Sequence, residues 1–120
     1  TALVAPGGKQ TSLGRDRNGY FVRCRWGTKI NGHCPSVGFL FESAARAAGP
    51  DSVGVILTGM GKDGAEGLLA MRRAGAFTVG QDERSSVVYG MPMAASEVGA
   101  VEEQAPPEKI AEIIVRRVRG

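Results

Sequence analysis

The spacing of apolar residues changes several times along the chain, and each change predicts a new element. Residues 53–57 are almost all apolar and consecutive, which is typical of a strand covered on both faces of a sheet. Residues 20–26 alternate after an Asn-Gly pair within 16–19, which predicts a hairpin turn followed by an antiparallel strand. Shorter apolar runs predict further strands at 2–4, 77–80 and 100–101, the last at a sheet edge.

Helical spacing of apolar residues appears between these runs. Ser36 is a predicted N-cap for a helix that ends at Gly49, and a second helix is expected over roughly 63–74. Proline at a first helical position starts a short helix at Pro92 and the final helix at Pro107. The alternation of strands and helices predicts an α/β fold, with a mostly parallel sheet, helices on both faces and an antiparallel hairpin near the N-terminus.

Length and composition narrow the classes of protein that this sequence can represent. Its 120 residues suffice for one compact domain, and its 18 glycines are scattered as in tight turns. Neither a membrane-spanning run nor a signal peptide is recognised, so no membrane insertion is expected. Cys24, Cys34 and the single histidine, His33, form no metal-ligand pattern; we expect two reduced thiols, no metal, and a cytoplasmic location.

The net charge of +3 is unevenly distributed. Residues 1–49 contain seven Lys or Arg and two acidic residues. Residues 50–120 contain eight Lys or Arg and ten acidic residues. The basic first section is either a surface for an acidic partner or simply a solvated face. Nucleic acid is not an expected partner, because the arginines lack the aromatic spacing of a base-stacking platform.

The glycine-rich loop 58–64 lies where ligands bind in an open α/β sheet, after a strand and before a helix. Residues 59–64 fit the dinucleotide-binding pattern G-x-G-x-x-G, and Asp82 follows at about the place of a ribose-binding acid. However, Asp63 would repel a pyrophosphate, and the chain has too few strands for two mononucleotide-binding halves. A dinucleotide-binding module therefore remains a minor alternative.

Acyl transfer is the second chemistry that this loop could serve. A carboxylate such as Asp63 can hold a histidine in the right tautomer and stabilise it as imidazolium. Backbone N–H groups in a glycine-rich turn can form an oxyanion hole. The competing interpretation is that Asp63 only caps the helix that begins near Gly64.

Several segments resemble the CheB-type chemotaxis methylesterases. The resemblance is carried by residues 55–65 around Thr58-Gly59-Met60-Gly61-Lys62-Asp63-Gly64, and by 68–76, 81–83, 85–92, 5–8 and 31–37. It implies a doubly wound α/β domain that hydrolyses glutamate methyl esters on chemoreceptors, often deamidates glutamine, and uses a Ser-His-Asp triad with no cofactor or metal. Asp63 matches the triad aspartate, and Met60, between Gly59 and Gly61, matches the residue whose backbone faces the oxyanion.

The resemblance also implies what this chain does not contain. The family's serine and histidine precede the point that Thr1 matches, so residues 1–120 correspond to the C-terminal portion of the catalytic domain, and a receiver domain often precedes it. Gln10, Cys34 and Gly38 stand where relatives usually have His, Arg and Asp. A substitute triad of Ser36, His33 and Asp63 is disfavoured, because Ser36 already serves as a helix start. An inactive half-domain that binds a partner or self-associates is the non-enzymatic alternative.

Overall fold

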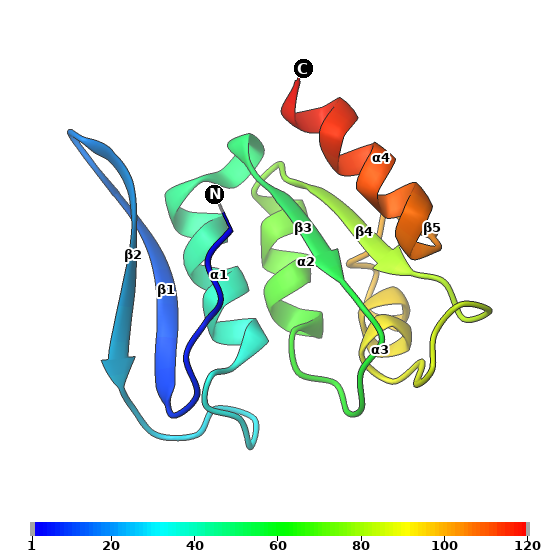
Figure 1. Ribbon diagram of the computed structural model, residues 1–120, viewed down its shortest axis with the longest axis horizontal. Coiled ribbons are helices and arrows are strands. Elements are labelled where there is room, and N and C mark those ends of the chain that lie inside the picture. Colours follow the sequence, from blue (N-terminus) through cyan, green and yellow to red (C-terminus); the bar gives the residue numbers. More distant parts are fainter. Residues whose placement is uncertain (1, 120) are drawn as a thin grey trace.

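The computed structural model describes residues 2–119, which form two sheets and four α-helices (Figure 1). In chain order the elements are β1 (Lys9–Asp16), β2 (Gly19–Trp26), α1 (Val37–Ala47), the 3-10 turn η1 (Gly49–Asp51), β3 (Val53–Ile56), α2 (Ala65–Arg73), β4 (Phe77–Gln81), α3 (Met91–Glu97), β5 (Glu103–Ala105) and α4 (Pro107–Val118). The predicted α/β fold is confirmed.

The central sheet has the order β3-β4-β5, and both pairs of neighbours are parallel. Successive residues of β3 point to opposite faces: Ile56 packs with α2 and α3, whereas Val55 packs with α4. The sheet therefore carries helices on both faces, as the alternating pattern predicts. The separate hairpin of β1 and β2 lies beyond α1, at the left of the molecule in Figure 1.

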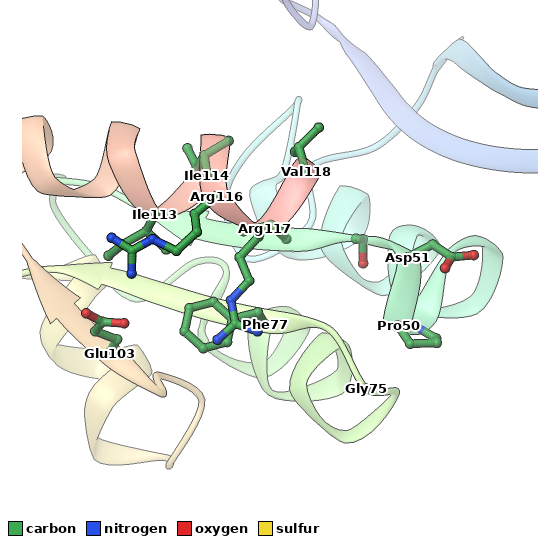
Figure 2. Close-up of a pocket in the computed structure, with 12 residues that line it drawn as sticks. Pro50, Asp51, Gly75, Phe77, Glu103, Ile113, Ile114, Arg116, Arg117 and Val118 are labelled. Atoms are coloured by element: carbon green, nitrogen blue, oxygen red, sulfur yellow. The ribbon is translucent and has the colours of Figure 1, made fainter. Parts of the chain in front are cut away.

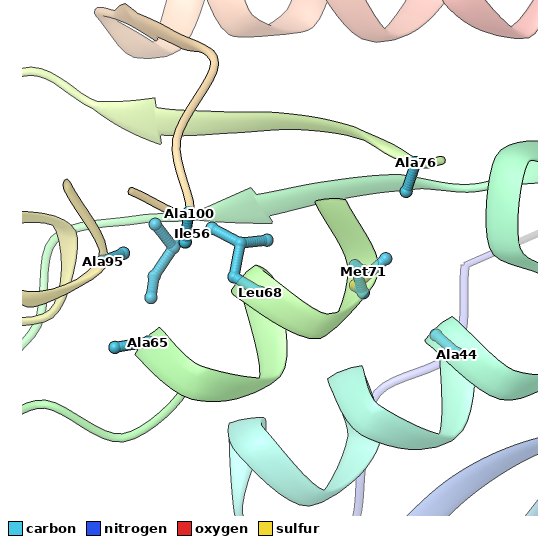
Figure 3. Close-up of a cluster of buried hydrophobic side chains, with 8 residues drawn as sticks. All are labelled: Ala44, Ile56, Ala65, Leu68, Met71, Ala76, Ala95 and Ala100. Atoms are coloured by element: carbon cyan, nitrogen blue, oxygen red, sulfur yellow. The ribbon is translucent and has the colours of Figure 1, made fainter. Parts of the chain in front are cut away.

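The larger apolar cluster lies between the sheet and the helices on one face (Figure 3). Ile56 and Leu68 are its largest fully buried side chains. Gly67 brings α2 close to α1, because a Cβ atom there would lie 2.7 Å from the Gly38 carbonyl oxygen. α1 packs between α2 and strand β1 of the hairpin, and not directly on the central sheet. This packing places the start of α1 beside the loop that enters α2.

Three details of the hairpin and sheet differ from expectation. The predicted strand at 2–4 is wrong: this segment is irregular, and Leu3 and Val4 are 73% and 92% exposed. The predicted strand at 100–101 is also wrong, because Ala100 is buried in the core and pairing begins at Glu103. β1 was not predicted as a strand, because its largely polar sequence has no run of apolar residues and is ordered by pairing with β2.

Helix boundaries agree more closely with the sequence. Ser36 is the N-cap of α1, as predicted, and its hydroxyl accepts a hydrogen bond from the Phe39 N–H at 3.2 Å. α2 begins at Ala65, two residues after the predicted start. None of the helices within residues 2–119 has both the length and the apolar character required to cross a membrane.

Candidate active site at the carboxyl end of strand β3

The glycine-rich loop after β3 is attached to the segment that leads into α3. The Thr58 hydroxyl donates to the Val88 carbonyl at 3.0 Å and accepts from the Val88 N–H at 2.9 Å. The Gly59 N–H donates to the same carbonyl, and the Gly59 carbonyl accepts from Met91 at 2.9 Å. These bonds join the ends of two adjacent strand–helix connections and fix the loop in position.

This attachment requires a glycine at position 90. A Cβ atom on Gly90 would lie 2.8 Å from the Gly59 carbonyl oxygen and 3.0 Å from the Gly61 nitrogen. The loop therefore rests directly on the Gly90 backbone. Met60, at the turn, is 78% exposed, and its N–H meets no protein acceptor within residues 2–119. This N–H is available to a ligand, as an oxyanion donor must be.

Asp63 is buried, with 4% of its surface exposed, and its carboxylate is surrounded by hydrogen-bond donors. Oδ1 accepts from the Ser36 hydroxyl at 2.8 Å, and Oδ2 accepts from the Val37 N–H at 2.7 Å. Longer bonds to Oδ1 come from the Gly38 N–H at 3.3 Å and the Asn31 side-chain amide at 3.4 Å. The carboxylate thus fits over the first turn of α1.

The competing interpretation, that Asp63 caps its own following helix, is wrong. The N-cap of α2 is Gly64, which has a φ of 96° and no side-chain cap hydrogen bond. Asp63 instead satisfies backbone N–H groups at the start of α1, 25 and 26 residues earlier in the chain. The carboxylate is therefore held by tertiary structure.

The hydrogen bonds also determine the ionisation of Asp63. Burial raises the pKa of its carboxyl, but the bonds from Ser36, Val37, Asn31 and Gly38 together outweigh burial and lower that pKa below the ordinary value of 3.8. The positive end of the α1 dipole acts in the same direction. Asp63 is consequently a carboxylate at neutral pH.

The substitute triad of Ser36, His33 and Asp63 does not have the geometry of a nucleophile and its base. Ser36 is only 1% exposed, and its hydroxyl donates straight to the Asp63 carboxylate with no imidazole between them. His33 is exposed, and its backbone forms two bonds to Ile30. Ser36 therefore caps α1 and holds the Asp63 carboxylate in position.

The positions that depart from the family pattern lie close to this network. Gln10 is buried and joins three segments: its amide donates to the Thr28 and His33 carbonyls at 3.0 and 3.1 Å, and its Oε1 accepts from the Ser36 N–H at 2.9 Å. A Cβ atom on Gly38 would lie 3.1 Å from Asp63 Oδ1. A longer acidic side chain there would crowd or repel the carboxylate. Cys34 is a free, partly buried thiol, and Cys24 is free and exposed.

Two cavities of similar size lie at opposite ends of the sheet. A groove of about 880 Å³ is lined by Val53 and Phe77, which begin β3 and β4, and by α4; Arg117 extends over the Phe77 ring there (Figure 2). A cleft of about 770 Å³ is lined by Asp63 and by the end of the loop after β3, from Gly61 to Gly64. Ligands of open α/β sheets bind at the carboxyl ends of the strands, so the Asp63 cleft is the candidate site.

Other chemistries fit this site less well. Asp82, which would bind a ribose, accepts from the N–H and hydroxyl of Ser85 in its own turn, and Asp63 places a negative charge where a pyrophosphate would lie. Within the part of the chain that the structure describes, no group of three His, Cys, Asp or Glu side chains is arranged to hold a metal ion.

Comparison with known proteins is consistent with the fold. Residues 1–114 match the family model described as CheB methylesterase. The chain is 55% identical over 116 residues to a protein-glutamate methylesterase/protein-glutamine glutaminase of Syntrophomonas wolfei, and 57% identical over 116 residues to one of Anaeromyxobacter dehalogenans. These matches cover 97% of this chain but only 34% and 33% of the two relatives.

A solved structure gives the same result. The crystal structure of the Thermotoga maritima CheB methylesterase catalytic domain superposes with a TM-score of 0.88 at 32% identity. That match covers 92% of this chain and 59% of the solved domain, so the chain corresponds to part of that domain. From the family model, the relatives and the shared fold together, the chain belongs to the CheB methylesterase family.

Proposed function

We propose that this chain forms the C-terminal portion of a protein-glutamate methylesterase catalytic domain and supplies its triad aspartate, Asp63. The observation that carries the proposal is the carboxylate itself. Asp63 is held ionised by the start of α1, at the wall of an open cleft at the carboxyl end of β3. The Met60 N–H, which meets no protein acceptor within residues 2–119, lies in the same loop.

In the proposed reaction, a serine and a histidine come from sequence that precedes Thr1. The serine Oγ attacks the carbonyl carbon of the glutamate methyl ester while the histidine accepts the serine proton. The negative oxygen that forms is stabilised by the Met60 N–H, supported by the turn at Gly59 and Gly61. Methanol leaves with the proton from the histidine, and water then hydrolyses the acyl-enzyme to a free glutamate.

Asp63 acts in this scheme through the histidine. Its fixed negative charge holds the imidazole in the tautomer that can accept a proton from serine, and it stabilises the imidazolium that results. Several donors fix the Asp63 carboxylate, so little reorganisation is needed as that charge develops. No cofactor or metal takes part.

The substrate and partners follow from the names of the relatives. Those proteins are called protein-glutamate methylesterase/protein-glutamine glutaminase, so we propose protein glutamate methyl esters as substrate, with glutamine deamidation as a second activity. The resemblance to the chemotaxis methylesterases adds methyl-accepting chemoreceptors as the proposed substrate proteins. A receiver domain in the same full-length protein is a further proposed partner. A cytoplasmic location stays a prediction.

The proposal is tested in a protein extended upstream of Thr1 by a family segment that carries the serine and histidine. Methanol release from methylated receptor is measured for this protein and for its Asp63→Ala variant. The expected loss is about 10⁴-fold in kcat, as for a triad aspartate. Glu108→Ala, an exposed change on α4 away from the cleft, is the control and should retain activity. An unchanged rate for Asp63→Ala would show that the triad assignment is wrong.

A second candidate function is self-association or partner binding by the half-domain. The observation that favours it is the outer edge of β3, which pairs with no other strand within residues 2–119. Such an edge presents unpaired backbone groups to another chain. Light scattering on the 120-residue chain tests this candidate: dimers or larger species are expected, and a monomer at all concentrations would argue against self-association.

A further inference from the structure

The hairpin of β1 and β2 differs from the rest of the molecule in its position and exposure. Residues 9–29, which we call the basic hairpin, extend from β1 through β2 to Lys29. β2 pairs only with β1, and every residue from Tyr20 to Trp26 is exposed (Figure 1). Burial in the core therefore does not explain the side chains of β2.

The basic hairpin carries the positive charge of the chain. It contains six cations, Lys9, Arg15, Arg17, Arg23, Arg25 and Lys29, and a single acid, Asp16. This excess of five charges is larger than the net +3 of the whole chain, so the remainder of the chain is net negative. The Asp16 carboxylate accepts from the Asn18 N–H within the hairpin turn. The field of the hairpin therefore attracts anionic partners.

Three aromatic rings in the hairpin each have a cation above them. Lys9 Nζ lies 4.9 Å from the centroid of the Trp26 ring, and the guanidinium of Arg15 lies 5.3 Å from that of Tyr20. Arg23 lies 5.5 Å from the centroid of the Phe21 ring. Phe21 lies on the opposite face of β2 from Tyr20 and Trp26, so the three rings form no continuous platform for stacked bases. Guanidiniums bind carboxylates through paired N–H groups.

The basic hairpin is continuous with the candidate active site. Arg25 and Trp26 line a hollow of about 270 Å³, and two of its walls, Ile30 and Phe39, also line the Asp63 cleft. Gln10 connects β1 to the Ser36 N–H beside Asp63. A ligand held on the hairpin thus lies next to the route into the cleft.

We propose that the basic hairpin is a docking surface for a carboxylate-rich segment of the substrate protein. The identity of this partner rests on the proposed function: each hydrolysis of a glutamate methyl ester leaves one more carboxylate on the substrate protein. Arg23 and Arg25 lie on the same face of β2 and form the core of the surface. Opposite charges there raise the rate of encounter and orient the segment toward the cleft.

The test measures binding of a fluorescent glutamate-rich peptide to the 120-residue chain by anisotropy, at about 0.02 M and about 0.2 M salt. The double variant Arg23→Ser/Arg25→Ser should bind about tenfold more weakly at low salt, and the difference should shrink at high salt. Arg84→Ser/Lys109→Ser removes the same charge from exposed sites outside the hairpin and is the matched control, expected to bind within about twofold of the parent chain.

Three binding results would overturn the inference. Equal losses in both double variants would mean that only net charge matters. Equal affinity for a peptide with glutamine in place of glutamate would mean that carboxylates are not recognised, and tighter binding of a single-stranded oligonucleotide would assign the surface to nucleic acid. The binding measurement needs no hydrolysis. Peptide binding by the 120-residue chain, together with no methanol release from methylated receptor by the upstream-extended protein, would contradict only the proposed function. Activity that is insensitive to the hairpin variant would contradict only this inference.

Discussion

The charge of Asp63 and the charges of the basic hairpin lie in opposite environments, one buried and the other exposed. Asp63 is buried and accepts hydrogen bonds from two segments that lie far from it in the sequence. Arg23 and Arg25 are exposed on a two-stranded hairpin outside the sheet. Burial among donors fixes the position and ionisation of a charge, whereas exposure leaves a long-range field with little contact energy.

The comparison separates the effects expected from mutation. Changes near Asp63 should lower the free energy of unfolding, because they leave buried donors without an acceptor. Changes on the hairpin should alter binding and its salt dependence while stability stays nearly constant. Mutations at the two regions should therefore differ in their effect on stability, with the largest loss at Asp63.

Asp63→Asn is expected to have the largest effect. The amide NH₂ group faces donors that need an acceptor, so the free energy of unfolding should fall by about 3 kcal/mol at pH 7. The loss should depend on pH. The folded-state pKa of Asp63 is lowered, so its stabilising contribution is present above the ordinary value of 3.8 and is lost as pH falls through the folded pKa.

Urea unfolding of both proteins between pH 7 and pH 2 checks this prediction. The difference between wild type and Asp63→Asn should be constant near neutral pH and should narrow below pH 3.8. Glu66→Gln removes an exposed carboxylate nearby and serves as the control. A pH-independent difference would mean that the Asp63 charge contributes nothing to stability.

Gly90→Ala tests the attachment of the glycine-rich loop. The new methyl group would press on the Gly59 carbonyl and the Gly61 nitrogen, so we expect a loss of about 2 kcal/mol and disordering around Met60. Gly7→Ala is the matched control, because a Cβ atom there meets nothing within 4 Å. Amide hydrogen exchange of residues 58–61 should rise in Gly90→Ala alone; unchanged exchange would show that the loop does not depend on this contact.

Ser36→Ala removes both the cap of α1 and one donor to Asp63. The expected cost is about 1 kcal/mol of unfolding free energy, the usual effect of losing a helix cap. Ser36→Thr, which retains the hydroxyl, should recover most of it. Ser12→Ala, in β1, is a neutral comparison. A Ser36→Ala variant as stable as the parent would show that Ser36 holds neither the helix nor the carboxylate.

Tyr20→Phe should have the smallest effect. The Tyr20 hydroxyl donates to the Asp51 carboxylate at 3.4 Å at an exposed site, and it is the side-chain bond that reaches from the hairpin tip to η1. We expect a change within about 0.5 kcal/mol in thermal or urea unfolding. A larger loss would mean that the hairpin is fixed to the domain through its tip, which would weaken the contrast with Asp63.

The sequence predicts those strands and helix starts whose determining residues lie within one short segment of the chain. The apolar run before the glycine-rich loop gives β3, Ser36 gives the start of α1, and prolines give the starts of α3 and α4. The loop after β3 is the candidate site because ligands bind at that end of a sheet.

Features that depend on distant segments were not predictable in the same way. The donors to Asp63 lie 25 to 32 residues before it, and no local pattern connects them. Gln10 links β1 to the start of α1 across 26 residues. The nearest signal in the sequence is the Asn31-Gly32 pair, which predicts a turn but not a bond from Asn31 to Asp63. The strand β1 was missed for a related reason, since its order comes from pairing with β2.

The proposed role of Asp63 requires that the fold holds its side chain as a carboxylate. The most direct measurement is a carbon-13 NMR titration of the Asp63 side-chain carboxyl in the 120-residue chain and in Ser36→Ala. The expected result is a titration midpoint below 3.8 in the parent chain and a higher midpoint in Ser36→Ala. A parent midpoint at or above 3.8, unaffected by Ser36→Ala, would contradict the claim.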